Sequence, residues 1–464
     1  MFATTDTIAA IATPAGRGGI GVVRVSGPDA QGVASRVLDI DRPLLPRHAT
    51  LTRVVIHRDA TQRPGASRPS YLDQVIATFF PEPRSYTGED VVEISAHGSP
   101  VILREIVATA MMAGARLAEP GEFTLRAFLS GRMDLIQAEA VADLVDAVTP
   151  RQARVAFDQL EGTLTERIGE IDARIFDLIA RMEASIDFPE EGYHFLDPDD
   201  ASRELGALAT SIDGLLGDGR RGRLIREGRQ VAIVGKPNVG KSSLFNYLVG
   251  ADRAIVTAHP GTTRDLVTEI VDVNGLVVTL VDTAGIRATT DLVEREGVRR
   301  ARGALDVADF ALLMLDRSRS LDADDRALVA SFPLPARLVV INKIDLPPAW
   351  NLDDLESRDG VIEVSLREAQ NLETLRTRLA DALGEWETPR DDAAISNLRH
   401  LELLERARAA VGRALDMVNR PTPQSEELLL VDLQDAKGAL EEITGRRTSE
   451  DTLRHIFDRF CIGK

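Results

Sequence analysis

The sequence predicts a mixed fold class, with two α/β domains and one all-α domain. Short β-branched segments separated by Gly, Pro and Ser clusters occupy about the first 115 residues, as in an α/β domain. Apolar residues recur at three- and four-residue intervals over 135–188 and again over about 396–444, which is the spacing of bundle helices. Between them, about 228–386 alternates strands and helices, which favours a doubly wound α/β domain inserted into one helical bundle.

Composition limits the class of protein before any motif is considered. At about 150 residues per domain, 464 residues suggest roughly three domains. Asp and Glu (73) outnumber Lys and Arg (55), so the formal charge of −18 argues against a uniformly basic nucleic-acid-binding surface and leaves local basic patches open. A single cysteine, Cys461, excludes an intrachain disulfide and favours a reducing compartment. With no basic leader and no apolar run of about 18 residues, we expect a cytoplasmic protein without a membrane segment.

Four segments are expected along the chain. The N-terminal α/β domain is expected to contain strands over 20–26, 50–57, 73–80 and 90–95 and a helix over 100–114. A domain inserts most readily where the ends of the host chain lie close together, so we expect the two helical segments to pack on each other. The expected boundaries are 1–130 for the N-terminal domain, 131–227 for the first half of the helical domain, 228–388 for the inserted domain and 389–464 for the second helical half.

The inserted domain begins with a phosphate-binding motif. A buried-type strand leads into GKPNVGKSS (235–243) and a helix, which matches G-x-x-x-x-G-K-[ST] in its strand–loop–helix context. Gly235 and Gly240 let backbone amides approach a phosphate, and the N-terminus of the following helix favours an anion. We expect Lys241 to reach the terminal phosphates and Ser242 to offer its hydroxyl to Mg²⁺.

Three further strands of the insert end in polar residues. One leads to Asp282 and Gly285, placed to meet Mg²⁺ and the γ-phosphate. The next leads to Asp345, whose carboxylate can accept from the ring N–H and the exocyclic amine of guanine, a donor pair that adenine lacks. Ser365 follows the last strand, so the insert is expected to bind guanine nucleotide. The candidate contacts are Asn238, Val239, Gly240, Lys241, Ser242, Ser243, Asp282, Thr283, Ala284, Gly285, Asn342, Lys343, Ile344, Asp345, Ser365, Leu366 and Arg367, with Thr257, Ala258, His259, Pro260, Gly261, Thr262 and Thr263 between the first two motifs.

The segment 254–265 resembles the mobile switch of GTPases, and Thr263 is its candidate second hydroxyl ligand of magnesium. The residue that follows D-x-x-G is Ile286, an apolar side chain that cannot orient the attacking water. A water-positioning group must therefore come from elsewhere, and the acidic residues of 291–296 are candidates. On the sequence pattern alone, any one of those glutamates is equally well a solvated helix residue.

Residues outside the insert carry a family resemblance that spans nearly the whole chain. GRGGIGVVRVSG (16–27), YTGEDVVEISAHGSP (86–100), PGEFTLRAFLSGRMDLIQAEAVADLVDA (120–147) and the terminal FCIGK, together with the GTP-binding motifs, resemble the tRNA-modification GTPase MnmE (TrmE) family. The resemblance implies an N-terminal folate-binding domain that dimerises, a central helical domain built from two chain segments, and an inserted GTPase domain.

The same resemblance implies a GTP hydrolase that takes part in tRNA modification. Its implied partner is the flavoprotein GidA (MnmG), which joins the homodimer in a heterotetramer. Together the two proteins install a carboxymethylaminomethyl or aminomethyl group at carbon 5 of the wobble uridine of certain tRNAs. The implied cofactors are GTP, magnesium, potassium and a tetrahydrofolate derivative that supplies the one-carbon unit.

The resemblance also implies roles for particular positions. The implied folate contacts are Arg24, Glu93, Arg132 and Lys464, with Arg132 in place of a lysine, which keeps the charge but changes the hydrogen-bond geometry. The implied potassium site consists of Asn238, Thr257, Thr262 and the backbone of His259. Glu294 matches the water-orienting glutamate and Cys461 a participant in the modification chemistry, whereas Leu366 departs from the family's alanine beside the base.

Other interpretations remain open on the sequence alone. A GTPase switch in ribosome assembly that binds RNA would share the insert but would need neither the first 135 residues nor the FCIGK tail. A purely structural dimeric scaffold would not need the intact set of phosphate ligands. Cys461 lies fourth from the end, as in a prenylation box, although Gly463 and Lys464 fit one poorly. The arginines of 219–229 either contact tRNA or belong to a solvated linker.

Overall fold

The computed structural model describes residues 5–56, 70–187, 197–252, 267–282, 308–332, 336–355, 357–383, 395–420 and 426–464. Contacts between residues divide the chain into two compact units. The first unit contains Met1–Ala142, Leu160–Glu191 and Glu426–Lys464, and the second contains Asp143–Gln159 and Gly192–Ser425. The predicted helical domain is therefore shared between the two units, each of which is described by itself.

A six-stranded sheet in the order β3-β4-β5-β2-β1-β6 forms the N-terminal part of the first unit. Its strands are β1 (Ile8–Ile11), β2 (Ile20–Ser26), β3 (Thr50–Ile56), β4 (Ser70–Phe80), β5 (Val91–His97) and β6 (Arg116–Leu117), all antiparallel except for the β1–β6 pair. Helices α1 (Ala30–Val37) and α2 (Pro100–Met112) pack against one face, where Val23, Val25 and Ile94 are buried. Because side chains alternate along a strand, Arg24 and its cross-strand partner Glu93 lie on the opposite face.

The expected strands of this domain are confirmed, with shifted ends. β4 begins three residues earlier than predicted, and β5 continues to His97 because it pairs with β2 over its whole length. The predicted helix also forms, and the chain turns after it at Gly114, which has a φ of +108°. That left-handed conformation favours glycine and explains why the helix ends there.

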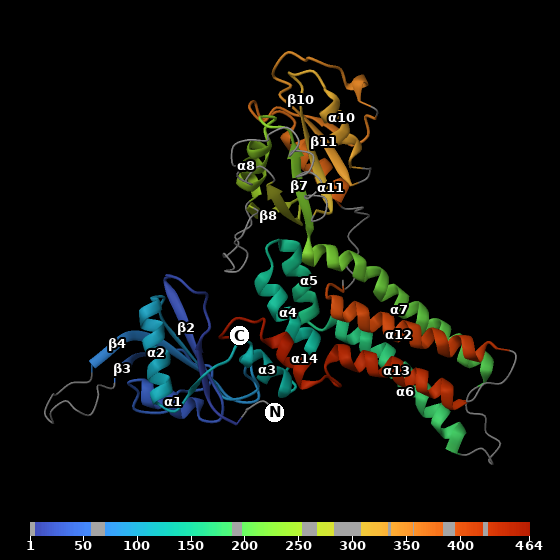
Figure 1. The fold of residues 1–464 in the computed structure, drawn as a ribbon. Helices are drawn as coiled ribbons and strands as arrows, with labels where there is room; N and C mark the ends of the chain where they lie inside the picture. The colour runs from blue at the N-terminus through green and yellow to red at the C-terminus, as the bar shows by residue number, and fades with distance from the viewer. Residues whose placement is uncertain are drawn as a thin grey trace. The chain divides into compact units, whose positions relative to one another are not determined.

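Helices from before and after the insert pack together in each unit. In the first unit, α6 (Thr163–Asp187) packs on α13 (Glu426–Thr444), and in the second, α7 (Pro198–Glu227) packs on α12 (Leu398–Val418) (Figure 1). The first unit also contains α3 (Glu122–Leu129) and α14 (Glu450–Phe457), which share an apolar cluster. Helices α4 (Leu135–Asp146) and α5 (Pro150–Leu160) are separated at Pro150, the first residue of its helix, where a missing N–H costs nothing. The prediction that the two helical segments pack together is confirmed.

The second unit contains a second six-stranded sheet, in the order β12-β11-β10-β7-β9-β8. Its strands are β7 (Arg229–Gly235), β8 (Val267–Val273), β9 (Leu276–Asp282), β10 (Phe310–Asp316), β11 (Arg337–Asn342) and β12 (Val361–Glu363), all parallel except for the β8–β9 hairpin. Val231 and Ile233 of β7 share a core with α8 (Lys241–Asp252) and α11 (Leu372–Leu383). Ala232 and Val234 share a second core with Leu328 of α10 (Ala323–Ala330). Helices thus cover both faces, as expected for a doubly wound sheet.

No helix in the described ranges combines the length and the apolar content that a membrane span requires.

Candidate functional site

The phosphate-binding loop joins the end of β7 to the start of α8. Gly240 has a φ of +110°, and a Cβ added there would lie 2.4 Å from Nδ2 of Asn342, so only glycine fits. Lys241 Nζ donates to the carbonyl oxygens of Gly235 (2.8 Å) and Lys236 (2.7 Å), so the loop curls around its own lysine. An ammonium and the first N–H groups of α8 at one glycine-lined turn are the donor set that nucleotide phosphates require.

Ser242 and Ser243 belong to the first turn of α8, and both are exposed. A hydroxyl at this position is a suitable oxygen ligand for Mg²⁺ beside bound phosphates. Asn238, one of the residues predicted to bind potassium, has a left-handed backbone with a φ of +64°. Such a conformation is tolerated by asparagine better than by most residues with a Cβ, so the loop has the residue type that its geometry favours.

Asn342 joins the phosphate-binding loop to the segment that follows β12. This residue is only 4% exposed, its Nδ2 donates to the Val239 carbonyl (2.8 Å), and its Oδ1 accepts from the Leu366 N–H (3.2 Å). Both functional groups of the amide are therefore used in holding two loops together. The side chain of Leu366, which departs from the family pattern, packs against the apolar core, so its backbone N–H makes the contact.

Asp345 and Ser365 lie together at the same edge of the sheet. Ser365 Oγ donates to Asp345 Oδ1 (2.7 Å) and accepts from the Glu368 N–H (3.1 Å). Asp345 Oδ2 makes no hydrogen bond to the described residues, so the carboxylate retains the acceptor capacity that a guanine edge needs. Ile344 donates its N–H to Val364, and the side chain of Arg367 is 79% exposed near Glu368.

Part of the predicted nucleotide site lies outside the described residues. This part comprises Thr257, Ala258, His259, Pro260, Gly261, Thr262, Thr263, Thr283, Ala284, Gly285, Glu294 and the side chain of Asp282, which ends β9. The roles predicted for these residues stay predictions. Three of the predicted elements, the phosphate-binding loop, the Asn342–Asp345 segment and the Ser365 segment, are in contact.

A second constellation lies on the face of the N-terminal sheet opposite α1 and α2, where Phe123 of α3 covers Ile8 and Ala10 of β1. Arg24 donates from Nε (3.0 Å) and Nη2 (2.9 Å) to the same Glu93 oxygen, Oε1. The Arg24 guanidinium also stacks over the rings of Tyr86 (4.9 Å) and Phe123 (5.6 Å). Since only Oε1 binds the guanidinium, Glu93 keeps a second oxygen that can accept hydrogen bonds from a ligand.

The C-terminal residues lie beside this pair. The Phe123 N–H donates to the Lys464 carbonyl (3.2 Å), and Ile462 forms a bridge with Pro120. Gly463 has a φ of +100°, and a Cβ there would lie 2.1 Å from the Ile11 carbonyl oxygen, so the tail is tightly seated. Arg24 and Lys464 thus both contact Phe123, Arg24 at the ring and Lys464 at the backbone N–H.

The other two residues predicted near the folate are exposed. Arg132 lies near Gly88, where an added Cβ would be 3.1 Å from the Arg132 Cγ. Cys461 is an exposed free thiol whose carbonyl accepts from the Gly121 N–H (3.4 Å). These contacts do not test the roles assigned to either residue, which stay predictions.

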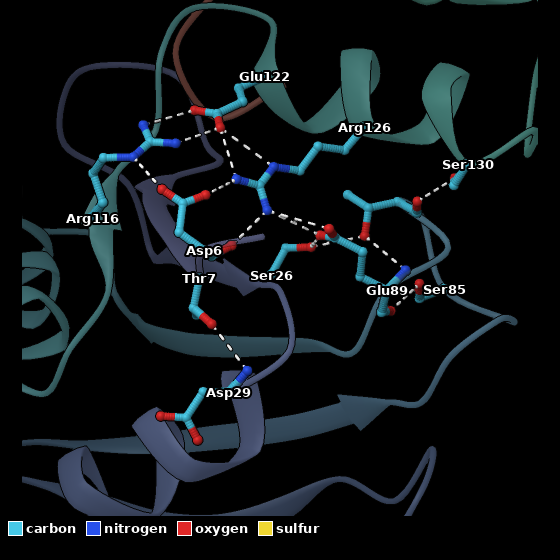
Figure 2. A network of polar contacts seen from close by, with 11 residues as sticks. Asp6, Thr7, Ser26, Asp29, Ser85, Glu89, Arg116, Glu122, Arg126 and Ser130 are labelled. Carbon is cyan, nitrogen blue, oxygen red and sulfur yellow. Dashed lines mark hydrogen bonds and ion pairs between the residues drawn. The ribbon is translucent and has the colours of Figure 1, made fainter. Parts of the chain in front are cut away.

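A buried ion-pair network in the first unit was not predicted (Figure 2). Arg126 of α3 is 1% exposed in its side chain and contacts Asp6 (2.6 Å), Glu122 (2.9 Å) and Glu89 (3.3 Å). Arg116 contacts two of these acids, Asp6 and Glu122, both at 2.7 Å. Two arginines and three carboxylates thus fix the start of α3, which carries Phe123. The one local signal in the sequence was an arginine inside the apolar stretch of PGEFTLRAF.

The network keeps Asp6 and Glu122 ionised. A hydrogen bond from Arg116 is the main reason why the pKa of the Asp6 carboxyl lies below its usual value, against the opposing effect of burial. Burial raises the pKa of Glu122, but hydrogen bonds from Arg116, the Glu119 backbone and Arg126 outweigh it, and the net pKa is lowered. Both arginines have a raised pKa, so Asp6, Glu122 and the two arginines carry charge at neutral pH.

Comparisons with known proteins agree with these observations. The family described as "MnmE helical domain" matches residues 135–461, and the one described as "GTP-binding protein TrmE N-terminus" matches residues 7–132. Proteins called tRNA modification GTPase MnmE are similar to this chain over nearly their whole length. The one from Nitrosomonas eutropha is 41% identical over 463 residues, which are 99% of this chain and 99% of that protein. The one from Azoarcus sp. is 44% identical over 462 residues, which are 99% of this chain and 98% of that protein. The solved G domain of the T. maritima FeoB iron transporter is 23% identical over 34% of this chain and 99% of that one, with a TM-score of 0.25, which is too low to support an argument.

Proposed function

Because the chain belongs to the tRNA modification GTPase MnmE family, we propose that this GTP-hydrolysing enzyme installs a (carboxymethyl)aminomethyl group at carbon 5 of the tRNA wobble uridine. The one-carbon unit comes from a tetrahydrofolate derivative, and the flavoprotein GidA (MnmG) is the partner in a heterotetramer. The family match over residues 7–132 favours this function over a switch in ribosome assembly, which needs no such N-terminal domain.

The Arg24–Glu93 pair is the observation that carries the folate part of the proposal. The pair lies on the sheet face opposite α1 and α2, and its arginine contacts two aromatic rings, one of which, Phe123, also contacts the C-terminal residue. An arginine next to a carboxylate with a free oxygen suits a heterocycle that presents several N–H donors, as a pterin does. Arg24, Glu93, Arg132 and Lys464 would hold the folate, which supplies the one-carbon unit when bound.

We assign GTP, magnesium and potassium to residues of the phosphate-binding loop and of the segment 257–263. Lys241 and the start of α8 would hold the phosphates, and Ser242 with Thr263 would bind magnesium. Asn238, Thr257, Thr262 and the His259 carbonyl would bind a potassium ion that offsets negative charge developing between the phosphates. Glu294 would orient the attacking water, since the residue after D-x-x-G is apolar.

The homodimer proposed from the family is supported by apolar side chains on the open face of the N-terminal sheet. Ile20, Leu51 and Ile76 are all exposed there, and Leu51 and Ile76 are direct cross-strand partners. Exposed apolar side chains gathered on one sheet face favour a surface that another protein covers. A second copy of residues 1–130 is the occupant that the family implies.

A reduced folate should protect the full chain against heat. We expect the unfolding midpoint of the N-terminal region to rise with folate concentration, because a ligand that binds only the folded state stabilises it by mass action. Arg24→Met should abolish the rise, because it removes the cation that holds Glu93. Arg36→Met, which alters an exposed arginine of α1, is the matched control and should retain it. No shift in the unaltered chain at millimolar folate would contradict the folate part of the proposal.

A further inference from the structure

Asp316 is a nearly buried carboxylate beside the residues assigned to guanine recognition. It ends β10, directly opposite Asn342 in the register with β11, and its side chain is 6% exposed. Its Oδ2 lies 2.6 Å from Lys343 Nζ, and its Oδ1 accepts from the backbone N–H (2.9 Å) and the hydroxyl (2.6 Å) of Ser318. The carboxylate is therefore held by its own loop and aimed at the lysine.

Lys343 has the least favourable backbone conformation of the residues from Asn342 to Asp345. It has a φ of +70°, in the left-handed region, which costs a residue with a Cβ about 1–2 kcal/mol. It also lies between Asn342 and Asp345, so its backbone conformation determines how the chain turns from the first to the second. The ion pair with Asp316 holds the Lys343 side chain in place and so stabilises the left-handed turn at this residue.

The backbone of the same loop is attached to β10 on either side of the ion pair. The Arg317 N–H donates to the Asn342 carbonyl (2.9 Å), and the Ala349 N–H donates to the Arg317 carbonyl (2.9 Å). Trp350 Nε1 donates to the carbonyl of Asp316 itself (3.0 Å), while its ring stacks under the Arg317 guanidinium (5.0 Å). Both ends of the Lys343 turn are thus anchored to the residues that flank the Asp316 carboxylate.

We propose that Asp316 is a positioning residue for the guanine-binding loop: it holds Lys343 and, through it, the Asn342–Asp345 turn. It controls how tightly and for how long guanine nucleotide is bound, and it has no part in phosphate cleavage. The proposal rests on the assignment of a guanine-nucleotide site to this edge of the sheet.

The charge of Asp316 supports this role. Burial raises the pKa of its carboxyl, but hydrogen bonds from Lys343 and Ser318 outweigh burial, so the pKa is lowered and the group is ionised at neutral pH. The other cation near Asp316 Oδ2 in the described part of the chain is Arg319, which is 3.9 Å away and 70% exposed. Lys343 is thus the cation closer to Asp316, and its own side chain, at 27% exposed, remains within reach of a ligand.

A double-mutant cycle on the full-length protein tests the proposal. The variants are Asp316→Asn, Lys343→Met and their combination, and the probe is GDP, with its dissociation constant and dissociation rate measured by fluorescence. Asp316→Asn should weaken GDP binding on the order of tenfold in the native background, the size expected for a charge-assisted hydrogen bond. In the Lys343→Met background the same change should have less than a twofold effect, because its partner is gone.

Steady-state kinetics supply a readout that a purely structural role would not give. For Asp316→Asn, KM for GTP should rise with the GDP dissociation constant while kcat stays within about twofold. Asp353→Asn is the matched control: this aspartate is exposed in the same sheet domain, pairs with Arg358, and should leave both quantities unchanged.

Several outcomes would overturn the proposal. Equal losses of GDP affinity in the two backgrounds, or a fall in kcat without a rise in KM, would show that Asp316 does not act through Lys343. If Asp316→Asn does not fold, the pair is tested from its other end: Lys343→Arg should retain GDP affinity and Lys343→Met should lose it, and equal losses would contradict the pairing. Failure of the unaltered chain to bind GDP would instead refute the nucleotide site itself.

Discussion

An added Cβ at Gly240 would lie 2.4 Å from Nδ2 of Asn342, the atom that binds the neighbouring Val239 carbonyl. Because Asn342 is buried and uses both ends of its amide, it cannot move aside without breaking a contact. One added carbon at Gly240 would therefore disrupt the hydrogen bond that joins Asn342 to the phosphate-binding loop. The sequence motif predicted the glycine, whereas its contact with Asn342 depends on the fold.

Gly240→Ala should abolish tight nucleotide binding. Besides the clash, the left-handed φ of +110° is unfavourable for alanine, so the loop has to adopt another conformation. GDP titration should show a loss of at least about a hundredfold, which corresponds to roughly 2.7 kcal/mol. Gly250→Ala is the control within α8: among the described residues outside its own helix, no atom lies within 4 Å of its added Cβ, so binding should be unchanged and the helix slightly stabilised. Normal GDP affinity in Gly240→Ala would contradict the loop geometry.

At the scale of elements, helix α3 links the ion-pair network to the proposed folate site. Glu122 of α3 binds Arg116 of β6, and Arg126 of α3 binds Asp6, which precedes β1. Phe123, next to Glu122, contacts the Arg24 guanidinium and the Lys464 carbonyl. The network therefore fixes the element on which the second site is built.

Arg126→Met should strongly destabilise the N-terminal part of the first unit. Removal of the guanidinium leaves Glu122 buried with fewer partners, and breaking a buried ion pair from one side costs about 3–5 kcal/mol. Hydrogen-exchange mass spectrometry on peptides from β1 and α3 measures this loss. The comparison is Arg36→Met, which removes a largely exposed pair with Asp29 and should cost at most about 1 kcal/mol. A loss of similar size in both variants would be at odds with the buried network.

The same network should make stability depend on acid pH. Asp6 and Glu122 have lowered pKa values in the folded chain, so their contribution is present above their ordinary values of about 4 and is lost as pH falls through the folded values. Protection of β1 and α3 amides, corrected for intrinsic exchange, should stay constant from pH 7 to about 5 and decline below about 4. Arg116→Gln should flatten this decline, and Asp29→Asn should not. A decline of the same steepness in Arg116→Gln would speak against the network as its origin.

The sequence predicted local features better than contacts between distant segments. The phosphate-binding loop, the type of most strands and the packing of the two helical segments were accessible because spacing and periodicity are local signals. The Asn342–Val239 contact joins residues 103 positions apart, and the Arg126 network draws on segments from Asp6 to Arg126. Which charged side chains meet across such separations depends on strand register and helix placement, which no local pattern encodes.

At the scale of the whole molecule, a GTP-hydrolysing domain and an N-terminal domain with its own candidate site belong to one chain. The family match extends over both, and the two halves of the helical region pack on each other within each unit. The central claim is that the chain uses its nucleotide site in the service of tRNA wobble-uridine modification.

Mass analysis of tRNA nucleosides from cells that lack the gene for this chain tests the claim most directly. We expect the nucleoside modified at carbon 5 of the wobble uridine to disappear and to return with the unaltered chain. A Lys241→Ala chain should not restore it, because Lys241 is the cation of the phosphate-binding loop. Unchanged levels of that nucleoside in the deletion strain would contradict the account.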